Sequence, residues 1–159
     1  MSLRIGFGFD THRLEEGMSL QLGGITILHS KGAVGHSDAD TLIHAICDAM
    51  LGAIAAGDIG THFPNTDPQY KDIDSKILLE HVIQITRTQY YVPVNLDCTV
   101  VIEKPRIMPH IPEIRECLSG ILGIPVMDIS IKAKTSEKIG FIGREEGVSA
   151  YAVVLLRKR

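Results

Sequence analysis

The N-terminal segment from Leu3 to Thr11 constrains the fold more than any other stretch of the chain. Its apolar residues recur at every second position, at Ile5, Phe7 and Phe9. That period is typical of a β-strand with one apolar face. The segment leads into Asp10-Thr11-His12, so the side chains of Asp10 and His12 point to one face of the strand. We expect a strand that carries two polar ligands near its end.

Asp10, His12 and His44 together can hold a divalent cation. His44 follows the motif His36-Ser37-Asp38-Ala39-Asp40, where the sequence predicts the start of a helix. Two imidazole nitrogens and one carboxylate oxygen are typical of zinc, with a fourth tetrahedral position left open for substrate. The alternative is three ordinary surface or capping groups. The predicted convergence of strand and helix favours the metal site.

The composition sets the outer bounds of the function. The chain has 159 residues, a formal net charge of −3 and no Trp, which argues against nucleic acid and anionic membranes as partners. We expect one domain over residues 1–159. Three widely separated cysteines without a CxxC pair predict free thiols and a cytoplasmic location. No apolar run is long enough for a membrane span.

Periodicity predicts strands separated by helices. A second β segment, broken at Gly23-Gly24, is expected to form a hairpin. The predicted helices begin at Ser37 and run to about Gly57, begin near Asp74 or Ser75, and pass through Ile114 to an end near Gly123. The predicted strands cover Leu3–Thr11, Leu20–Leu28, Val94–Glu103, Ile129–Lys134 and Val148–Arg157, and the polar stretches around Gly32 and Pro64 are expected to be loops.

This order predicts the α+β class, a mixed β-sheet with helices on one face. The other face would leave apolar residues such as Val153 and Leu155 uncovered, which favours self-association over a closed monomer.

Several other motifs have an ordinary structural interpretation. The lone histidines His29, His62, His81 and His110 are expected to be surface or capping groups. Gly57-Asp58-Ile59-Gly60 is either a helix stop or a substrate loop. His36 precedes a helix start that can hold an anion, and the segment from Lys134 to Arg144 has hydroxyls, bases and glycines that suit phosphate. Neither a P-loop nor a dinucleotide fingerprint is present in the sequence.

Taken in order, these segments resemble the 2-C-methyl-D-erythritol 2,4-cyclodiphosphate synthase family over nearly the whole chain. The resemblance is carried by residues 4–12, 36–40, 57–60, 109–112, 135–141 and 143–144. It implies a homotrimer whose sheets pack around the central axis, with active sites at the subunit interfaces. It also implies zinc on Asp10, His12 and His44, and magnesium or manganese on Glu137 with the substrate diphosphate.

The resemblance further implies the substrate contacts. His36 and Thr135 would be catalytic and steady the transition state. The phosphate and methylerythritol contacts would come from Asp10, His12, His36, Ser37, Asp58, Ile59, Gly60, Phe63, Pro64, Asn65, Thr66 and Asp67. The cytidine diphosphate contacts would come from Ile102, Glu103, Lys104, Pro105, Arg106, Ile107, Met108, Lys134, Thr135, Ser136 and Glu137. Phe141 and Arg144 would also bind the substrate. An isoprenoid diphosphate on the trimer axis, facing Arg144, is a weaker expectation.

The implied reaction closes a cyclic diphosphate in the non-mevalonate isoprenoid pathway. The 2-phosphate of 4-diphosphocytidyl-2-C-methyl-D-erythritol 2-phosphate would attack the β-phosphate and expel CMP, which is the chemistry of a phosphorus-oxygen lyase. Asn65, Arg106 and Lys134 depart from the family pattern, so we expect retained activity with altered nucleotide affinity. Two other classes stay open: a phosphoesterase that gives a linear product, and a nucleotide-binding module without turnover.

Overall fold

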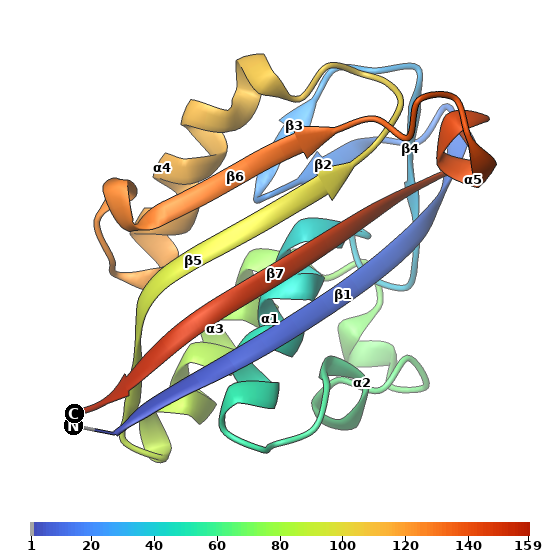
Figure 1. The fold of residues 1–159 in the computed structure, drawn as a ribbon. Helices are drawn as coiled ribbons and strands as arrows, with labels where there is room; N and C mark the ends of the chain where they lie inside the picture. Colours follow the sequence, from blue (N-terminus) through green and yellow to red (C-terminus); the bar gives the residue numbers. More distant parts are fainter. Residues whose placement is uncertain (1) are drawn as a thin grey trace.

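The chain folds around a five-stranded sheet in a computed structural model that describes residues 2–159. The strand order is β4-β1-β7-β5-β6, and each pair is antiparallel except β5 with β6 (Figure 1). The strands are β1 (Leu3–Glu16), β4 (Lys31–Val34), β5 (Tyr91–Val101), β6 (Ile129–Lys134) and β7 (Gly147–Lys158). A separate hairpin joins β2 (Leu20–Leu22) to β3 (Ile25–Ile27).

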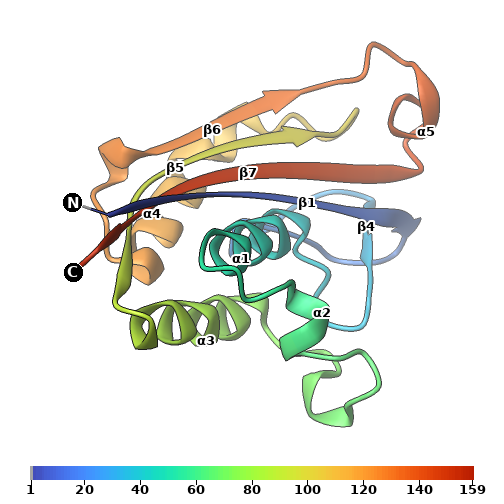
Figure 2. The same ribbon diagram turned by 60° about the horizontal axis from the view of Figure 1, so that its bottom comes forward.

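The helices cover one face of this sheet, as Figure 2 shows. The long ones are α1 (Thr41–Ala53), α3 (Ser75–Thr88) and α4 (Ile111–Leu122). Short turns of helix lie in the connections, namely α2 (Ile59–His62), α5 (Gly140–Gly143), η1 (Pro68–Tyr70), η2 (Met108–His110) and η3 (Val126–Asp128). The predicted α+β class, with a mixed sheet and helices on one face, is confirmed.

The face of the sheet opposite the helices is apolar and exposed. Its exposed side chains are Ile5 (74%), Phe7 (62%), Phe9 (48%), Tyr151 (38%) and Val153 (41%). Phe9 and Tyr151 stack obliquely, with ring centroids 5.1 Å apart. The alternating apolar residues that predicted β1 from the sequence therefore lie on the face of the sheet that is uncovered in a single chain.

The covered face of β1 is built from glycines, which let α1 approach closely. A Cβ atom on Gly6 would lie 1.7 Å from the carbonyl oxygen of Ala49, and one on Gly8 would lie 1.9 Å from that of Ala45. Contacts this short exclude any side chain at either glycine. Asp10 and His12 continue the same face of β1, so this approach brings His44 of α1 alongside them.

Some predicted boundaries are wrong. The segment around Gly32 is strand β4 and not a loop, and β1 continues to Glu16. Helix α1 begins after Asp40 and not at Ser37, because the Asp40 carboxylate caps the helix by accepting the N–H of Ile43 at 2.9 Å. The helix ends at Ala53, short of Gly57. Ala39 has φ 58°, which is incompatible with a helix that starts earlier.

Other elements agree closely with the prediction. The break at Gly23-Gly24 is the turn of the β2–β3 hairpin, α3 begins at Ser75, and α4 ends at a left-handed Gly123. Strand β6 has the predicted bounds, whereas β5 begins at Tyr91 and ends at Val101, two residues before Glu103.

The single domain over residues 1–159 stays a prediction, with Met1 outside the described residues. From Ser2 onward, no helix has the length and apolar character needed to cross a membrane.

Candidate metal centre and its two pockets

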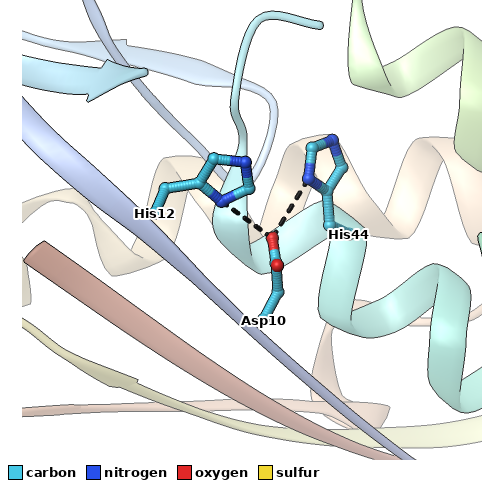
Figure 3. Close-up of side chains that lie close together, drawn as sticks. All are labelled: Asp10, His12 and His44. Atoms are coloured by element: carbon cyan, nitrogen blue, oxygen red, sulfur yellow. Dashed lines mark hydrogen bonds and ion pairs between the residues drawn. The ribbon is translucent and has the colours of Figure 1, made fainter. Parts of the chain in front are cut away.

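Asp10, His12 and His44 meet where the middle of β1 passes over α1, because β1 continues beyond His12 to Glu16. The Nδ1 atom of His12 lies 2.9 Å from Oδ2 of Asp10, and Nδ1 of His44 lies 3.1 Å from the same oxygen (Figure 3). Figure 3 shows both imidazole rings turned toward the Asp10 carboxylate. The sequence-based prediction that strand and helix converge here is confirmed.

The donor set fits a small divalent cation. The three candidate ligand atoms lie within 4.8 Å of one another. A tetrahedral zinc ion with bonds near 2.0–2.1 Å would place its ligand atoms about 3.3 Å apart, close to the separations of the two imidazole nitrogens from Asp10. All three residues come from regular elements that pack against each other. We conclude that these side chains could bind a metal ion without a change of backbone.

The electrostatics of the centre favour charged ligands. Burial raises the pKa of Asp10, but hydrogen bonds and charge from His12 and His44 outweigh it and lower that pKa to about 2. Burial lowers the pKa of His44, but its hydrogen bond to Asp10 and the nearby carboxylates outweigh that effect, so the net shift is upward. Both shifts therefore favour the charged forms of Asp10 and His44, which attract each other.

The centre forms the floor of a cavity of about 260 Å³. Predicted substrate contacts that line it are Asp10, His12, His36, Ser37, Ile59, Gly60, Phe63 and Asn65. The predicted contacts Asp58, Pro64, Thr66 and Asp67 are in the same loop but do not line the cavity. Asp58 instead caps α2, accepting the N–H of Thr61 at 2.9 Å, and the Asp67 carbonyl lies 3.3 Å from Nε2 of His36.

A second cavity, of about 220 Å³, lies where β5 and β6 end. It is lined by predicted nucleotide contacts, namely Ile102, Glu103, Pro105, Arg106, Ile107, Met108, Lys134 and Thr135, together with Ala133. Glu103 accepts the backbone N–H of Ser136 at 3.2 Å, which ties the two strand ends together. Lys104 points elsewhere, to an ion pair with Glu145 at 3.0 Å.

The two cavities have no lining residue in common. Glu137, predicted as the ligand of a second ion, is exposed and does not belong to the Asp10 group. Phe141 packs near Gly147, and Arg144 pairs with Glu146 at 2.9 Å. Within one chain the metal centre and the second cavity are therefore separate sites.

Three polar residues near the centre were not assigned a role from the sequence. Ser75 and Asp38 lie behind His44, and Asp48 accepts the N–H of Ile59 at 2.7 Å, which holds α2 against α1. Asp40, the N-cap of α1, accepts the N–H groups of Gly23 and Gly24 and so turns toward the β2–β3 hairpin.

Two of the lone histidines have structural partners, in agreement with their ordinary interpretation. His62 lies 2.8 Å from the carbonyl oxygen of Ala56, and His81 stacks on Phe63 with ring centroids 6.0 Å apart.

Comparison with known proteins identifies close relatives. The model of the YgbB family matches residues 3–157. A 2-C-methyl-D-erythritol 2,4-cyclodiphosphate synthase from Porphyromonas gingivalis is 60% identical over 153 residues, which are 96% of this chain and 94% of the relative.

Solved structures share the fold. The bifunctional IspDF from Campylobacter jejuni matches with a TM-score of 0.95 and 34% identity over 99% of this chain, which spans 43% of that longer chain. A CDP complex of IspF from Plasmodium falciparum matches with a TM-score of 0.87 and 34% identity, over 99% of this chain and 97% of that one.

Proposed function

The chain belongs to the YgbB family of 2-C-methyl-D-erythritol 2,4-cyclodiphosphate synthases, and on that premise we propose the reaction that it catalyses. It converts 4-diphosphocytidyl-2-C-methyl-D-erythritol 2-phosphate into 2-C-methyl-D-erythritol 2,4-cyclodiphosphate and CMP. The observation that carries the proposal is the Asp10–His12–His44 centre on the floor of a cavity, in a chain 60% identical to a synthase of that name.

The reaction is an intramolecular phosphoryl transfer. The 2-phosphate oxygen forms a bond to the β-phosphorus, and the bond from that phosphorus to the bridging oxygen of CMP breaks. A phosphate monoester has a second pKa near ~6, so it is largely ionised at neutral pH and needs no general base. The task of the protein is to fold a highly charged substrate back on itself and to offset its charge.

The residues around the first cavity are suited to that task. Asp10, His12 and His44 would hold zinc, which supplies Lewis-acid stabilisation of phosphate oxygens when bound. His36 and Ser37 line the same cavity and can donate hydrogen bonds to a phosphate. In this proposal His36 and Thr135 stabilise the charge that develops in the transition state. The methylerythritol hydroxyls are assigned to the loop from Asp58 to Asp67, of which Ile59, Gly60, Phe63 and Asn65 line the cavity.

The second cavity suits the cytidine diphosphate end of the substrate. Lys134 and Arg106 give it positive charge, and Thr135 adds a hydroxyl. The CDP complex of the Plasmodium falciparum relative supports a cytidine nucleotide as ligand. Glu137, next to this cavity in the chain, would hold magnesium or manganese together with the diphosphate.

We propose a homotrimer, and the separation of the two cavities and the uncovered sheet face support it. If the apolar face around Phe7 and Tyr151 packs about a threefold axis, a neighbouring subunit can bring its nucleotide cavity to the metal centre. Arg144 would then face the axis, where an isoprenoid diphosphate could bind. A cytoplasmic location and the phosphorus-oxygen lyase class belong to the same proposal.

Phosphorus NMR of the substrate mixed with zinc- and magnesium-loaded protein tests this function. We expect signals of a cyclic diphosphate and CMP, and neither product with the His12→Ala variant. A linear phosphate product would assign a phosphoesterase instead. Tight binding without product would assign a nucleotide-binding module, and either result would overturn the proposal.

A further inference from the structure

The imidazole of His44 has a hydrogen-bonding partner on the side that faces away from Asp10. Its Nε2 atom lies 2.9 Å from the hydroxyl oxygen of Ser75. Ser75 is the first residue of α3 and is completely buried. The ring of His44 is thus held between a β-strand on one side and the start of a helix on the other.

Ser75 is in turn bound to a carboxylate. Its hydroxyl donates to Oδ1 of Asp38, and its backbone N–H donates to Oδ2 of Asp38 at 3.0 Å. The N–H of Asp40 also donates to Oδ1 of Asp38, at 3.2 Å. The carboxylate of Asp38 therefore accepts three hydrogen bonds, which involve both of its oxygens.

These contacts determine which nitrogen of His44 carries a proton. A hydroxyl has one proton, and that of Ser75 goes to Asp38, so the Ser75 oxygen can only accept a hydrogen bond from His44. The Nε2 atom must therefore be the donor. In a neutral imidazole this leaves Nδ1 with its lone pair free, and Nδ1 is the atom that faces Asp10.

We propose that Ser75 and Asp38 are positioning residues of the metal centre, which hold His44 in the tautomer and orientation that present Nδ1 to the cation. The inference rests on the metal centre of the proposed function. A hydrogen bond from the outer nitrogen of a metal-binding histidine to a carboxylate fixes the ring and makes it a stronger ligand. Here the Ser75 hydroxyl lies between the two groups: it accepts a hydrogen bond from His44 and donates one to Asp38.

Ser37 provides a matched control, because its hydroxyl lies 3.0 Å from the same Nε2 atom. Unlike Ser75, it is only partly buried and lines the cavity. Its oxygen accepts the N–H of Ala39 at 3.3 Å, whereas the oxygen of Ser75 is anchored to Asp38. Removing the Ser37 hydroxyl leaves the path to the carboxylate intact.

The zinc affinity of the purified protein, measured by competition with a chromophoric chelator, tests the proposal without any substrate. We expect 10- to 100-fold weaker binding for Ser75→Ala and for the isosteric Asp38→Asn. Ser37→Ala should stay within about threefold of the wild type, since it lacks the carboxylate link. The double variant Asp38→Asn/Ser75→Ala should bind no more weakly than the weaker single variant, because the two residues act in series.

Ring signals of His44 separate this role from a structural one. In long-range proton–nitrogen NMR spectra of the zinc-loaded protein, we expect a protonated Nε2 whose signals move in Ser75→Ala but not in Ser37→Ala. If Ser75→Ala fails to fold, Asp38→Asn carries the same test. The positioning role would be overturned if Ser75→Ala and Asp38→Asn bound zinc as tightly as the wild type, or if His44 carried its proton on Nδ1 in the zinc-loaded protein. Either result would leave the metal centre itself in place. A wild type that binds no zinc would remove the metal centre itself.

Discussion

Asp10 is the residue on which the metal centre depends, since one of its carboxylate oxygens is shared by two imidazoles. In the metal-free protein its contact with the two imidazoles lowers its own pKa to about 2 and raises the pKa of His44. A cation that binds there competes with a proton for Nδ1 of His44, so zinc affinity falls as the pH is lowered.

The pH dependence of metal-free stability follows from these shifts. The lowered pKa of Asp10 adds stability above its unfolded pKa near ~3.9, which is lost as the pH falls toward about 2. The raised pKa of His44 adds stability below its unfolded pKa near ~6.5, which is lost as the pH rises through the folded value. Urea unfolding of the wild type and of His44→Gln should show the largest difference near pH 5 and a smaller one once the pH has risen through the folded pKa of His44. A difference that does not vary with pH would contradict this account.

At the scale of elements, the contact between β1 and α1 sets the position of the centre. Gly6 and Gly8 allow backbone to lie against backbone, and His44 reaches Asp10 because of it. The motif Gly6-x-Gly8, which fails as a dinucleotide fingerprint, is explained by this packing. Without the close approach, strand and helix would stand too far apart to share a ligand set.

Gly8→Ala should therefore destabilise the protein by about 3 kcal/mol or more and weaken zinc binding, since its Cβ would lie 1.9 Å from a backbone oxygen. Gly52→Ala, on the helix α1 that packs against Gly8, is the matched control. A Cβ atom on Gly52 would lie 3.9 Å from its nearest neighbour, the carbonyl oxygen of Phe7. We therefore expect the stability of the protein to rise by up to about 1 kcal/mol, because alanine has the higher helix propensity. Urea unfolding measures both, and equal effects would refute the packing argument.

The elements also show what the sequence can predict. The periodicity of apolar residues, together with the turn and capping residues between segments, identified the long strands and helices. The two-residue spacing placed Asp10 and His12 on one face of β1. Strand β4 escaped prediction because its four residues are too few to show a period. The contact between Ser75 and His44 joins residues 31 apart, and no local pattern encodes such a pair.

At the scale of the whole molecule, the two cavities that we propose to form one active site are separate in a single chain. The sheet face around Phe7, Phe9 and Tyr151 is apolar and uncovered. Assembly about that face would bury it and would let two copies complete one site.

Phe7→Arg, in the centre of that face, should convert a trimer into monomers because charged side chains would be buried at the interface. Sedimentation should show the mass falling to one third of the wild-type mass. Leu28→Arg is the control, because Leu28 is also apolar and 96% exposed but follows β3, which is not part of the five-stranded sheet. A wild type of single-chain mass, or a Phe7→Arg variant that stays trimeric, would contradict the proposed assembly.

Subunit complementation tests the central claim most directly. His12→Ala removes the metal centre, and Thr135→Tyr fills the nucleotide cavity, so each variant alone should form no cyclic diphosphate. After the two are mixed equally, unfolded and refolded together, random trimers would contain about one intact site in four. Recovery of roughly a quarter of wild-type activity, read by phosphorus NMR, is the result we predict. No recovery, with both variants folded and mixed, would show that the two cavities of different subunits do not form one active site.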